Sequence, residues 1–307
     1  MKRELTIQEL LQRGVNILEN KGNVNPLLDT QLLLCYTLKV DKVYIYTHRN
    51  EKVSIINVDK FLNLLNRRET GYPLQYILGK QEFMGLDFEV AEGVLVPRPD
   101  TETIVEWIVE VVNTSNLVEK DQINILDIGT GSGAIALSLA YFIKNSIVYT
   151  IDISDKALDI AKRNANTLNL EEKVKFLKGD LFEPLKDLDE NIRFDIIVSN
   201  PPYIPSKEID DLQIEVASYE PRLALDGGED GLDFYKRIVD KSTQYLRKGG
   251  ILALEIGYNQ GKQVKKLLID QQGFKDIEIR SDLAGLERAI LSRRQGTSDE
   301  NGSKLGG

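Results

Sequence analysis

Apolar residues recur at helical spacing through the N-terminal part of the chain. A capping box over Thr6–Glu9 precedes the apolar positions of Leu10–Leu18, and Asn25-Pro26 supplies a cap and a first-turn proline for a second helix. A third helix is expected over Ser54–Thr70, whereas Val43–Thr47 suits either a strand or a helix. The pattern predicts a small helical domain.

The period of the pattern changes after residue 75. Residues 76–96 alternate around Gly85 and predict a β-hairpin. From residue 97 strand-like runs alternate with helical ones, which is typical of an α/β fold with a doubly wound, mostly parallel sheet. The expected strands are Ile123–Ile128, Ile147–Asp152, Val174–Gly179, Phe194–Ser199 and Gly250–Ile256, and helices are expected over Ser154–Leu168 and Leu232–Leu246.

Two further strand-like runs, Lys275–Ser281 and Arg288–Arg293, are joined by a short loop without a helix. They predict an antiparallel pair that completes a seven-stranded sheet. Residues 294–307 are rich in Gly, Ser and charge and are predicted to be disordered. The predicted domains are therefore a helical domain over 1–75, a hairpin linker over 76–96, an α/β domain over 97–293 and the tail.

Composition narrows the possible chemistry. The 307 residues carry a formal net charge of -9, which argues against a broad surface for nucleic-acid phosphates. The single cysteine, Cys35, and the single histidine, His48, leave no disulfide framework, no Ser-His-Asp triad and no multi-histidine metal site. Without an apolar run of membrane-spanning length or a signal-peptide core, the chain is expected to be cytoplasmic.

A glycine-rich loop follows the first expected strand of the α/β domain. Its residues are Gly129, Thr130, Gly131, Ser132 and Gly133. Glycines there allow a tight turn and a close ligand approach under a helix N-terminus, but the G-x-G-x-G spacing is neither the dinucleotide fingerprint nor a P-loop. Asp152 ends the next strand, where its carboxylate can accept both hydroxyls of a ribose. Asp180 and Leu181 follow the third strand and are placed to meet an adenine.

A second loop follows the strand Phe194–Ser199, at the edge where doubly wound sheets bind ligands. Its residues are Asn200, Pro201, Pro202 and Tyr203. An amide nitrogen is a poor nucleophile because its lone pair is delocalised. The side-chain carbonyl of Asn200 and the backbone carbonyl of Pro201 can accept hydrogen bonds from its N–H groups and turn the lone pair toward an incoming methyl group. Tyr203 offers a flat face to a planar substrate group.

These loops resemble those of class I S-adenosylmethionine-dependent methyltransferases, whose glutamine- and adenine-methylating branches share the NPPY loop. Three upstream stretches are more specific: PLQYILG at 73–79, EFMGL at 82–86 and VLVPRPDTE at 94–102. They resemble the bacterial release factor glutamine methyltransferases, known as PrmC and formerly as HemK, and the similarity extends over roughly residues 5–293. PRPDTE at 97–102 discriminates best, because the sibling ribosomal protein glutamine methyltransferases carry a serine-containing variant.

The resemblance implies a Rossmann-like methyltransferase domain that uses S-adenosylmethionine and releases S-adenosylhomocysteine. No metal is expected, because the chain has one Cys, one His and no carboxylates clustered at ligand spacing. The resemblance also implies that Gly129–Gly133, Asp152, Asp180 and Leu181 contact the cofactor, with Asn200 beside it. Asn200–Tyr203 would contact the substrate, the glutamine of the GGQ motif in class-1 peptide-chain release factors. The helical domain would dock this protein substrate. A monomer is expected, with no direct nucleic-acid contact and no membrane contact.

Other functions stay open at this point. A ribosomal protein glutamine methyltransferase would use the same loop, and so would a nucleic-acid adenine N6-methyltransferase that flips a base into it, although the acidic charge disfavours the latter. A non-catalytic cofactor-binding or assembly protein would not need an intact NPPY loop. Methyl transfer itself requires alignment more than a strong base, since an N-protonated amide loses its proton readily.

Overall fold

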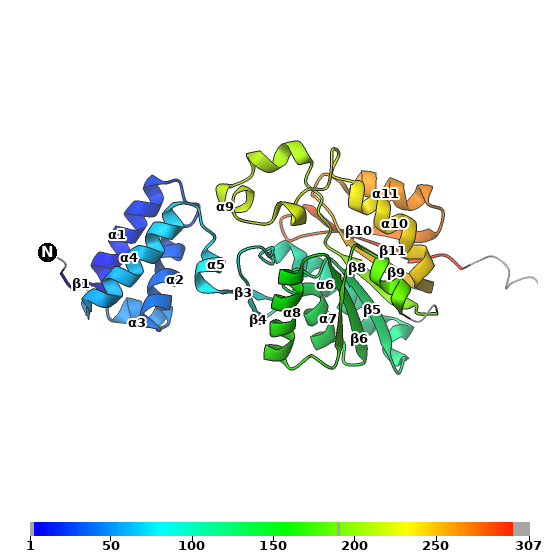
Figure 1. Ribbon diagram of the computed structural model, residues 1–307, viewed down its shortest axis with the longest axis horizontal. Helices are drawn as coiled ribbons and strands as arrows, with labels where there is room; N and C mark the ends of the chain where they lie inside the picture. The colour runs from blue at the N-terminus through cyan, green and yellow to red at the C-terminus, as the bar shows by residue number, and fades with distance from the viewer. Residues whose placement is uncertain (1–2, 189–190, 297–307) are drawn as a thin grey trace, which may run out of the picture. The chain divides into compact units, whose positions relative to one another are not determined.

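The computed structural model describes residues 3–188 and 191–296 and divides into two compact units (Figure 1). Unit 1 comprises residues 1–80 together with 212–219, and unit 2 comprises residues 81–211 and 220–307. A short segment that follows the NPPY loop in the sequence therefore belongs to the N-terminal unit. The tail was predicted to be disordered over 294–307, but Arg294 is the last residue of a strand and Gln295 N donates to the Gly273 carbonyl at 2.8 Å. Residues 297–307 of the predicted tail lie outside the described residues.

Unit 1 is mainly helical. Its elements are β1 (Leu5–Thr6), α1 (Ile7–Asn20), α2 (Pro26–Leu38), α3 (Lys42–Thr47), β2 (Lys52–Val53), α4 (Ile55–Glu69), α5 (Leu74–Leu78) and α9 (Ile214–Ala217). The predicted capping box is present, with Glu9 N donating to Thr6 Oγ1 at 3.1 Å and Thr6 N to Glu9 Oε2 at 2.8 Å. The ambiguous run after residue 42 is helical, because the Asp41 side chain caps it by accepting from Tyr44 N at 2.7 Å.

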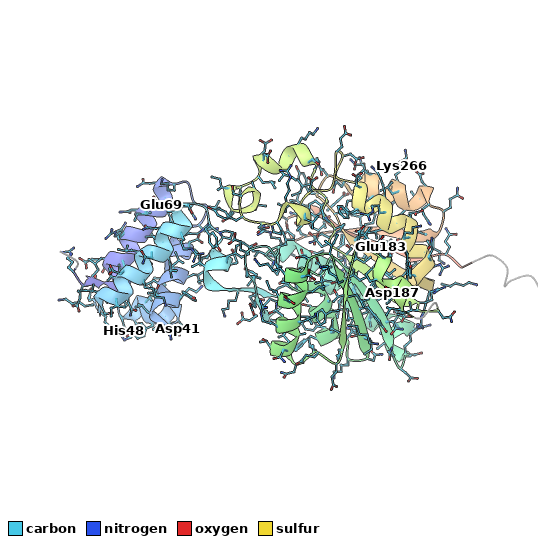
Figure 2. The ribbon with its side chains drawn as sticks, in the orientation of Figure 1. Asp41, His48, Glu69, Glu183, Asp187 and Lys266 are labelled. Atoms are coloured by element: carbon cyan, nitrogen blue, oxygen red, sulfur yellow. The ribbon has the colours of Figure 1, made fainter. Side chains whose placement is uncertain are left out.

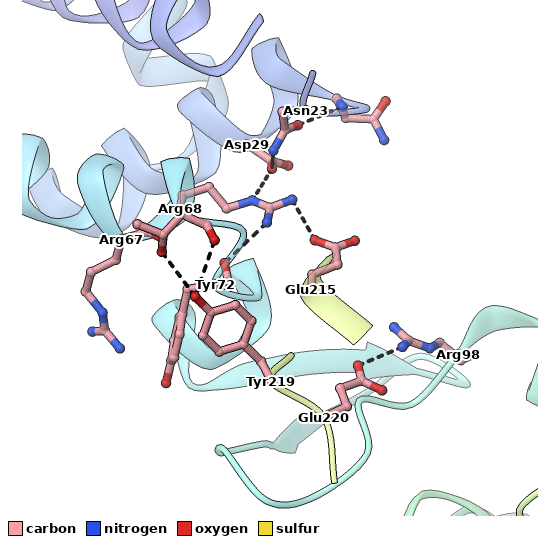
Figure 3. Close-up of polar contacts among 11 residues, drawn as sticks. Asn23, Asp29, Arg67, Arg68, Tyr72, Arg98, Glu215, Tyr219 and Glu220 are labelled. Atoms are coloured by element: carbon pink, nitrogen blue, oxygen red, sulfur yellow. Dashed lines mark hydrogen bonds and ion pairs between the residues drawn. The ribbon is translucent and has the colours of Figure 1, made fainter. Parts of the chain in front are cut away.

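A buried arginine connects three parts of unit 1, as Figure 3 shows. Arg68 Nε donates to Asp29 Oδ2 at 2.6 Å, one terminal nitrogen pairs with Glu215 at 2.8 Å, and the other donates to the Tyr72 carbonyl at 3.2 Å. A buried guanidinium is tolerated only when it is paired and hydrogen-bonded. These contacts therefore hold segment 212–219 on the helices of unit 1.

Unit 2 contains the large sheet. Its elements are β3 (Lys80–Phe83), β4 (Leu86–Glu89), η1 (Pro99–Thr101), α6 (Glu102–Thr114), η2 (Asn116–Glu119), β5 (Ile123–Ile128), α7 (Ala134–Phe142), β6 (Ser146–Asp152), α8 (Asp155–Leu168), β7 (Val174–Lys178), η3 (Glu183–Asp187), β8 (Phe194–Ser199), η4 (Ser206–Asp211), η5 (Arg222–Ala224), α10 (Asp233–Tyr245), β9 (Leu246–Glu255), α11 (Gly261–Asp270), β10 (Phe274–Ser281) and β11 (Glu287–Arg294).

The seven strands of that sheet lie in the order β10-β11-β9-β8-β5-β6-β7. Strands β5 to β9 pair in parallel, and β11 is antiparallel to both of its neighbours. The predicted doubly wound α/β sheet and its terminal antiparallel pair are confirmed. β9 begins at Leu246, earlier than predicted, because Leu246 pairs with Phe194 across a register shift.

Helices cover both faces of the sheet, so its central strands are apolar on both sides. Along β8, Ile196 and Val198 pack into the core beneath α6 and α7, while Ile197 packs into the core beneath α10 and α11. The hairpin predicted over residues 76–96 is present as the pair β3–β4, but it is shorter than predicted, because Tyr76–Leu78 belong to the helix α5. No helix in the described part of the chain has both the length and the apolarity of a membrane span.

Candidate active site

A cavity of about 360 Å³ opens in unit 2 where the parallel strands end, and its volume lies within the usual range of small-molecule pockets. Most of its wall comes from the loops that follow β5, β6, β7 and β8. Its lining includes Arg98, Thr101, Gly129, Thr130, Gly131, Ser132, Asp152, Asp180, Leu181, Asn200, Pro201, Pro202, Phe234 and Arg237. The structure therefore brings most of the predicted cofactor and substrate residues to one place.

The two sequence motifs meet because their strands are neighbours. Ile128, the last residue of β5, pairs in register with Ser199, the last residue of β8. The Ser199 hydroxyl donates to the Ile128 carbonyl at 2.7 Å. The glycine loop and the NPPY loop therefore leave the same edge of the sheet side by side.

The glycine loop curves over a buried carboxyl group. Gly129, Gly131 and Gly133 have φ of 83°, 55° and 86°, in the left-handed region that glycine adopts readily. Beneath them, Asp127 accepts from the Thr150 hydroxyl at 2.7 Å. Burial raises the pKa of Asp127 to about 7, against the lowering effect of that bond. The loop is thus supported by polar side chains within the same two strands and their turns.

Asp152 stands at the end of β6 with both carboxylate oxygens engaged. Oδ2 accepts from Gly131 N at 2.9 Å and Oδ1 from Ser154 N at 2.8 Å. A carboxylate has about four acceptor sites, so it can still receive the two hydroxyls of a ribose. Burial raises the pKa of Asp152, and these backbone donors oppose that shift. The donor and acceptor pattern fits a nucleoside.

Asp180 and Leu181 line the next part of the wall. Asp180 forms an ion pair with Arg237 of α10, whose guanidinium lies 5.6 Å from the ring centroid of Phe234. Leu181 has a φ of 50°. Sequence reasoning missed Arg237 and Phe234, because helix residues carry no motif that marks which turn faces the cavity.

Two of the predicted site residues do not line the cavity. Tyr203 packs against the apolar core, its carbonyl accepts from Gln260 Nε2 at 2.9 Å, and burial raises its pKa. Gly133 instead precedes α7, where a side chain would approach Leu137 at 2.9 Å and Ala161 at 3.2 Å. In this structure both residues support the loops rather than form the wall.

Two buried polar residues stand behind Asn200, and sequence reasoning assigned them no role. Asn200 Nδ2 donates to Thr101 Oγ1 at 3.3 Å. The Glu255 carboxyl, at the end of β9, is buried, and its Oε2 has no hydrogen-bond partner. Burial raises the pKa of this carboxyl to about 7, although the nearby Thr101 and Asn200 side chains lower it. Thr101 and Glu255 are 4% and 3% exposed, respectively. They connect the NPPY loop to two distant segments.

The stretch at 97–102 makes further contacts on both sides of Thr101. Arg98 pairs with the buried Glu220 at 2.7 Å, as Figure 3 shows. Asp100 pairs with Arg288 of β11 at 2.9 Å. Glu102 accepts from the Met84 backbone N–H in the β3–β4 turn at 2.6 Å. The stretch that distinguished the sequence therefore fixes the surroundings of the NPPY loop.

The single histidine and the single cysteine do not line this cavity. His48, labelled in Figure 2, is exposed in unit 1. Its ring stacks on that of Tyr44 with centroids 3.9 Å apart. Cys35, also in unit 1, is partly buried. Across residues 3–188 and 191–296, no three His, Cys, Asp or Glu side chains gather to hold a metal ion.

Comparisons with known proteins agree with this geometry. Residues 9–79 match the PrmC N-terminal domain, and residues 111–217 match the methyltransferase small domain. A release factor glutamine methyltransferase from Clostridium acetobutylicum is 41% identical over 95% of this chain and 100% of its own length. One from Moorella thermoacetica is 40% identical over 95% of this chain and 99% of its own. A solved human structure, methyltransferase 10 domain containing protein, has a TM-score of 0.51 and 19% identity and covers 68% of this chain and 88% of that one, which shows the fold alone.

Proposed function

Because the chain belongs to the release factor glutamine methyltransferase family, we propose that it methylates N5 of the glutamine in the GGQ motif of class-1 peptide-chain release factors. The observation that carries the proposal is the single cavity lined by both the glycine loop and the NPPY loop. S-adenosylmethionine would supply an electrophilic methyl group, whose bond to sulfur breaks as the bond to nitrogen forms while the amide proton leaves to solvent.

The protein's own residues provide alignment. The carbonyl oxygens of Asn200 and Pro201 accept from the two N–H groups of the substrate amide and hold its nitrogen in line. Asp152 accepts from the ribose hydroxyls, and Gly129–Ser132 let the backbone approach the cofactor closely. No general base is required.

The two parts of the chain have different roles in this reaction. Unit 1, which contains the matched PrmC N-terminal domain, docks the release factor, and residues 97–293 carry out the reaction. The chain acts as a monomer in the cytoplasm, without direct contact to nucleic acid or membrane. No metal takes part.

The experiment that tests this function is transfer of a labelled methyl group to purified release factor. Mass spectrometry of the GGQ peptide should show one methyl group on the glutamine. Ribosomal protein, DNA and RNA are offered to the same enzyme in parallel. Stronger labelling of any of these than of the release factor would contradict the proposal and favour another NPPY N-methyltransferase.

A further inference from the structure

Asn200 can present either end of its amide group to the cavity, and the two ends have opposite chemistry. The oxygen Oδ1 accepts hydrogen bonds and the nitrogen Nδ2 donates them. A substrate amide nitrogen needs an acceptor, whereas a substrate carboxylate needs a donor. What fixes the rotation of this one side chain therefore fixes which substrate group the cavity accepts.

The contacts behind Asn200 determine that rotation. Asn200 Nδ2 donates to Thr101 Oγ1 at 3.3 Å. The buried Glu255 carboxyl is near both side chains, and Thr101 and Asn200 each lower its pKa, as groups that can donate to a carboxylate do. The register of β8 against β9 brings Asn200 and Glu255 close together. Ser199 pairs with Leu254, and Asn200 and Glu255 are the residues that follow these two.

When Glu255 is ionised, only one arrangement of hydrogen-bond donors and acceptors is possible among Glu255, Thr101 and Asn200. A carboxylate only accepts, so the single hydroxyl proton of Thr101 goes to Glu255. Thr101 Oγ1 can then only accept, and it takes the N–H end of Asn200. The opposite end of the amide, Oδ1, is left for the cavity that Asn200 lines.

We propose that Thr101 and Glu255 are positioning residues that hold the Asn200 carbonyl toward the substrate and thereby select glutamine over glutamate. The inference rests on the proposed function and names the source of its specificity. Without the Thr101 hydroxyl, Asn200 Nδ2 loses its hydrogen-bond acceptor, and only the Glu255 carboxyl still opposes rotation of the amide by half a turn. Its N–H group would then meet the substrate, where it pairs with a carboxylate and repels an amide N–H.

The ionisation of Glu255 makes turnover depend on pH, which gives a second measurement of the same arrangement. The charged and titratable groups that act on it are Asp100, Arg288, Tyr203 and Tyr235. Burial and, to a smaller extent, Asp100 raise its pKa, the Arg288 guanidinium lowers it, and the resulting pKa is about 7. Below that pH a protonated Glu255 can donate to Thr101, and the fixed order of donors is lost. Turnover of the wild-type enzyme should therefore fall as the pH drops below about 7.

The test compares Thr101→Val, which keeps the shape without the hydroxyl, with Thr101→Ser, which keeps the hydroxyl, and with Glu255→Gln. Four quantities are measured on the full chain: turnover on GGQ release factor, inhibition by the GGE release factor, affinity for S-adenosylmethionine and the thermal midpoint. We expect Thr101→Val to lower turnover by about 100-fold, as a misaligned nitrogen does, with cofactor affinity unchanged. GGE release factor should inhibit this variant more strongly than it inhibits wild type.

The conservative variants make the outcome decisive. Thr101→Ser should recover turnover to within about tenfold of wild type. Glu255→Gln, whose amide can donate to Thr101 as the protonated acid does, should show lowered turnover that no longer changes with pH near 7. Equal turnover of the Val and Ser variants, or unchanged inhibition by GGE release factor in Thr101→Val, overturns the inference alone. A wild-type enzyme that leaves GGQ release factor unmethylated overturns the proposed function, and this inference with it.

Discussion

The two sides of the cavity are supported in different ways. On the glycine-loop side, Thr130 and Thr150 bond to Asp127, and Gly131 bonds to Asp152, so the support comes from two consecutive strands and their turns. On the NPPY side, Asn200 depends on Thr101 and Glu255, which lie in distant parts of the sequence. The glycine-loop side is supported by residues close in the sequence, and the NPPY side by residues that only the fold brings together.

This difference separates binding from selectivity. The local side offers backbone groups and one carboxylate, which suit a cofactor common to many methyltransferases. The fold-dependent side sets the direction of the Asn200 amide. That direction distinguishes a substrate glutamine, which carries an amide, from a glutamate, which carries a carboxylate. Changes on the first side should act on cofactor affinity, and changes on the second side should act on turnover and substrate choice.

The largest effect is expected from the substrate itself. Replacing the GGQ glutamine by glutamate places a carboxylate against two carbonyl oxygens, and sites built around hydrogen bonds reject such analogues by about 10⁴-fold. Asparagine keeps the amide but falls short by about 1 Å, which costs on the order of 100-fold. Initial rates of methyl transfer to the three release factors measure both ratios. A glutamate variant methylated as fast as glutamine would show that the NPPY side does not select an amide.

Asn200→Ala should have the next largest effect. It removes one of two acceptors for the substrate amide, and removal of one aligned hydrogen-bonding group in an active site lowers turnover by about 10²- to 10³-fold. Affinity for S-adenosylmethionine, measured by calorimetry, should change far less. A loss of cofactor affinity as large as the loss of turnover would contradict the division between the two sides.

The fold was more predictable from the sequence than the site. Strand β5 and the helix α8 follow from buried apolar runs and from a Ser154 cap, which are local signals. The attachment of segment 212–219 to unit 1 was not foreseen, because it depends on Arg68 meeting Glu215 and the sequence does not show which distant charges meet.

The same physical limit applies within the site. The glycine loop and NPPY could be placed at one sheet edge because each follows a strand. Thr101 was noticed only as a letter in a family motif, and Glu255 was not noticed at all. Their roles arise from strand register and burial, which no short motif encodes.

Asp152→Ala tests the local side. Charge-assisted hydrogen bonds are worth roughly 1.5–3 kcal/mol, so affinity for S-adenosylmethionine should fall by about tenfold to a hundredfold. At saturating cofactor, the preference for glutamine over glutamate should be unchanged, because Asn200 and its supports are intact. Calorimetry gives the affinity, and the rate ratio gives the preference. An altered ratio would show that the two sides are coupled.

The smallest effects are expected from two glycines of the same loop: one replacement should mainly lower cofactor affinity and the other should mainly lower stability. At Gly131, a methyl group meets no atom within 4 Å of its position, and the φ of 55° costs alanine about 1–2 kcal/mol. That methyl group would lie on the cavity wall, so Gly131→Ala should bind S-adenosylmethionine less tightly, by about tenfold, while it lowers stability only by the backbone cost.

Gly133 is the matched control, because it belongs to the same loop but does not line the cavity. A methyl group there would approach the side chains of Leu137 at 2.9 Å and Ala161 at 3.2 Å, in addition to the cost of a φ of 86°. Overpacking of this kind costs about 1–3 kcal/mol, so Gly133→Ala should show the lower free energy of unfolding. Its affinity for the cofactor, measured below the unfolding transition, should stay closer to wild type than that of Gly131→Ala. If the two variants lost affinity equally, the loop would act as one rigid unit, and the assignment of cofactor contact to its cavity-facing residues would be wrong.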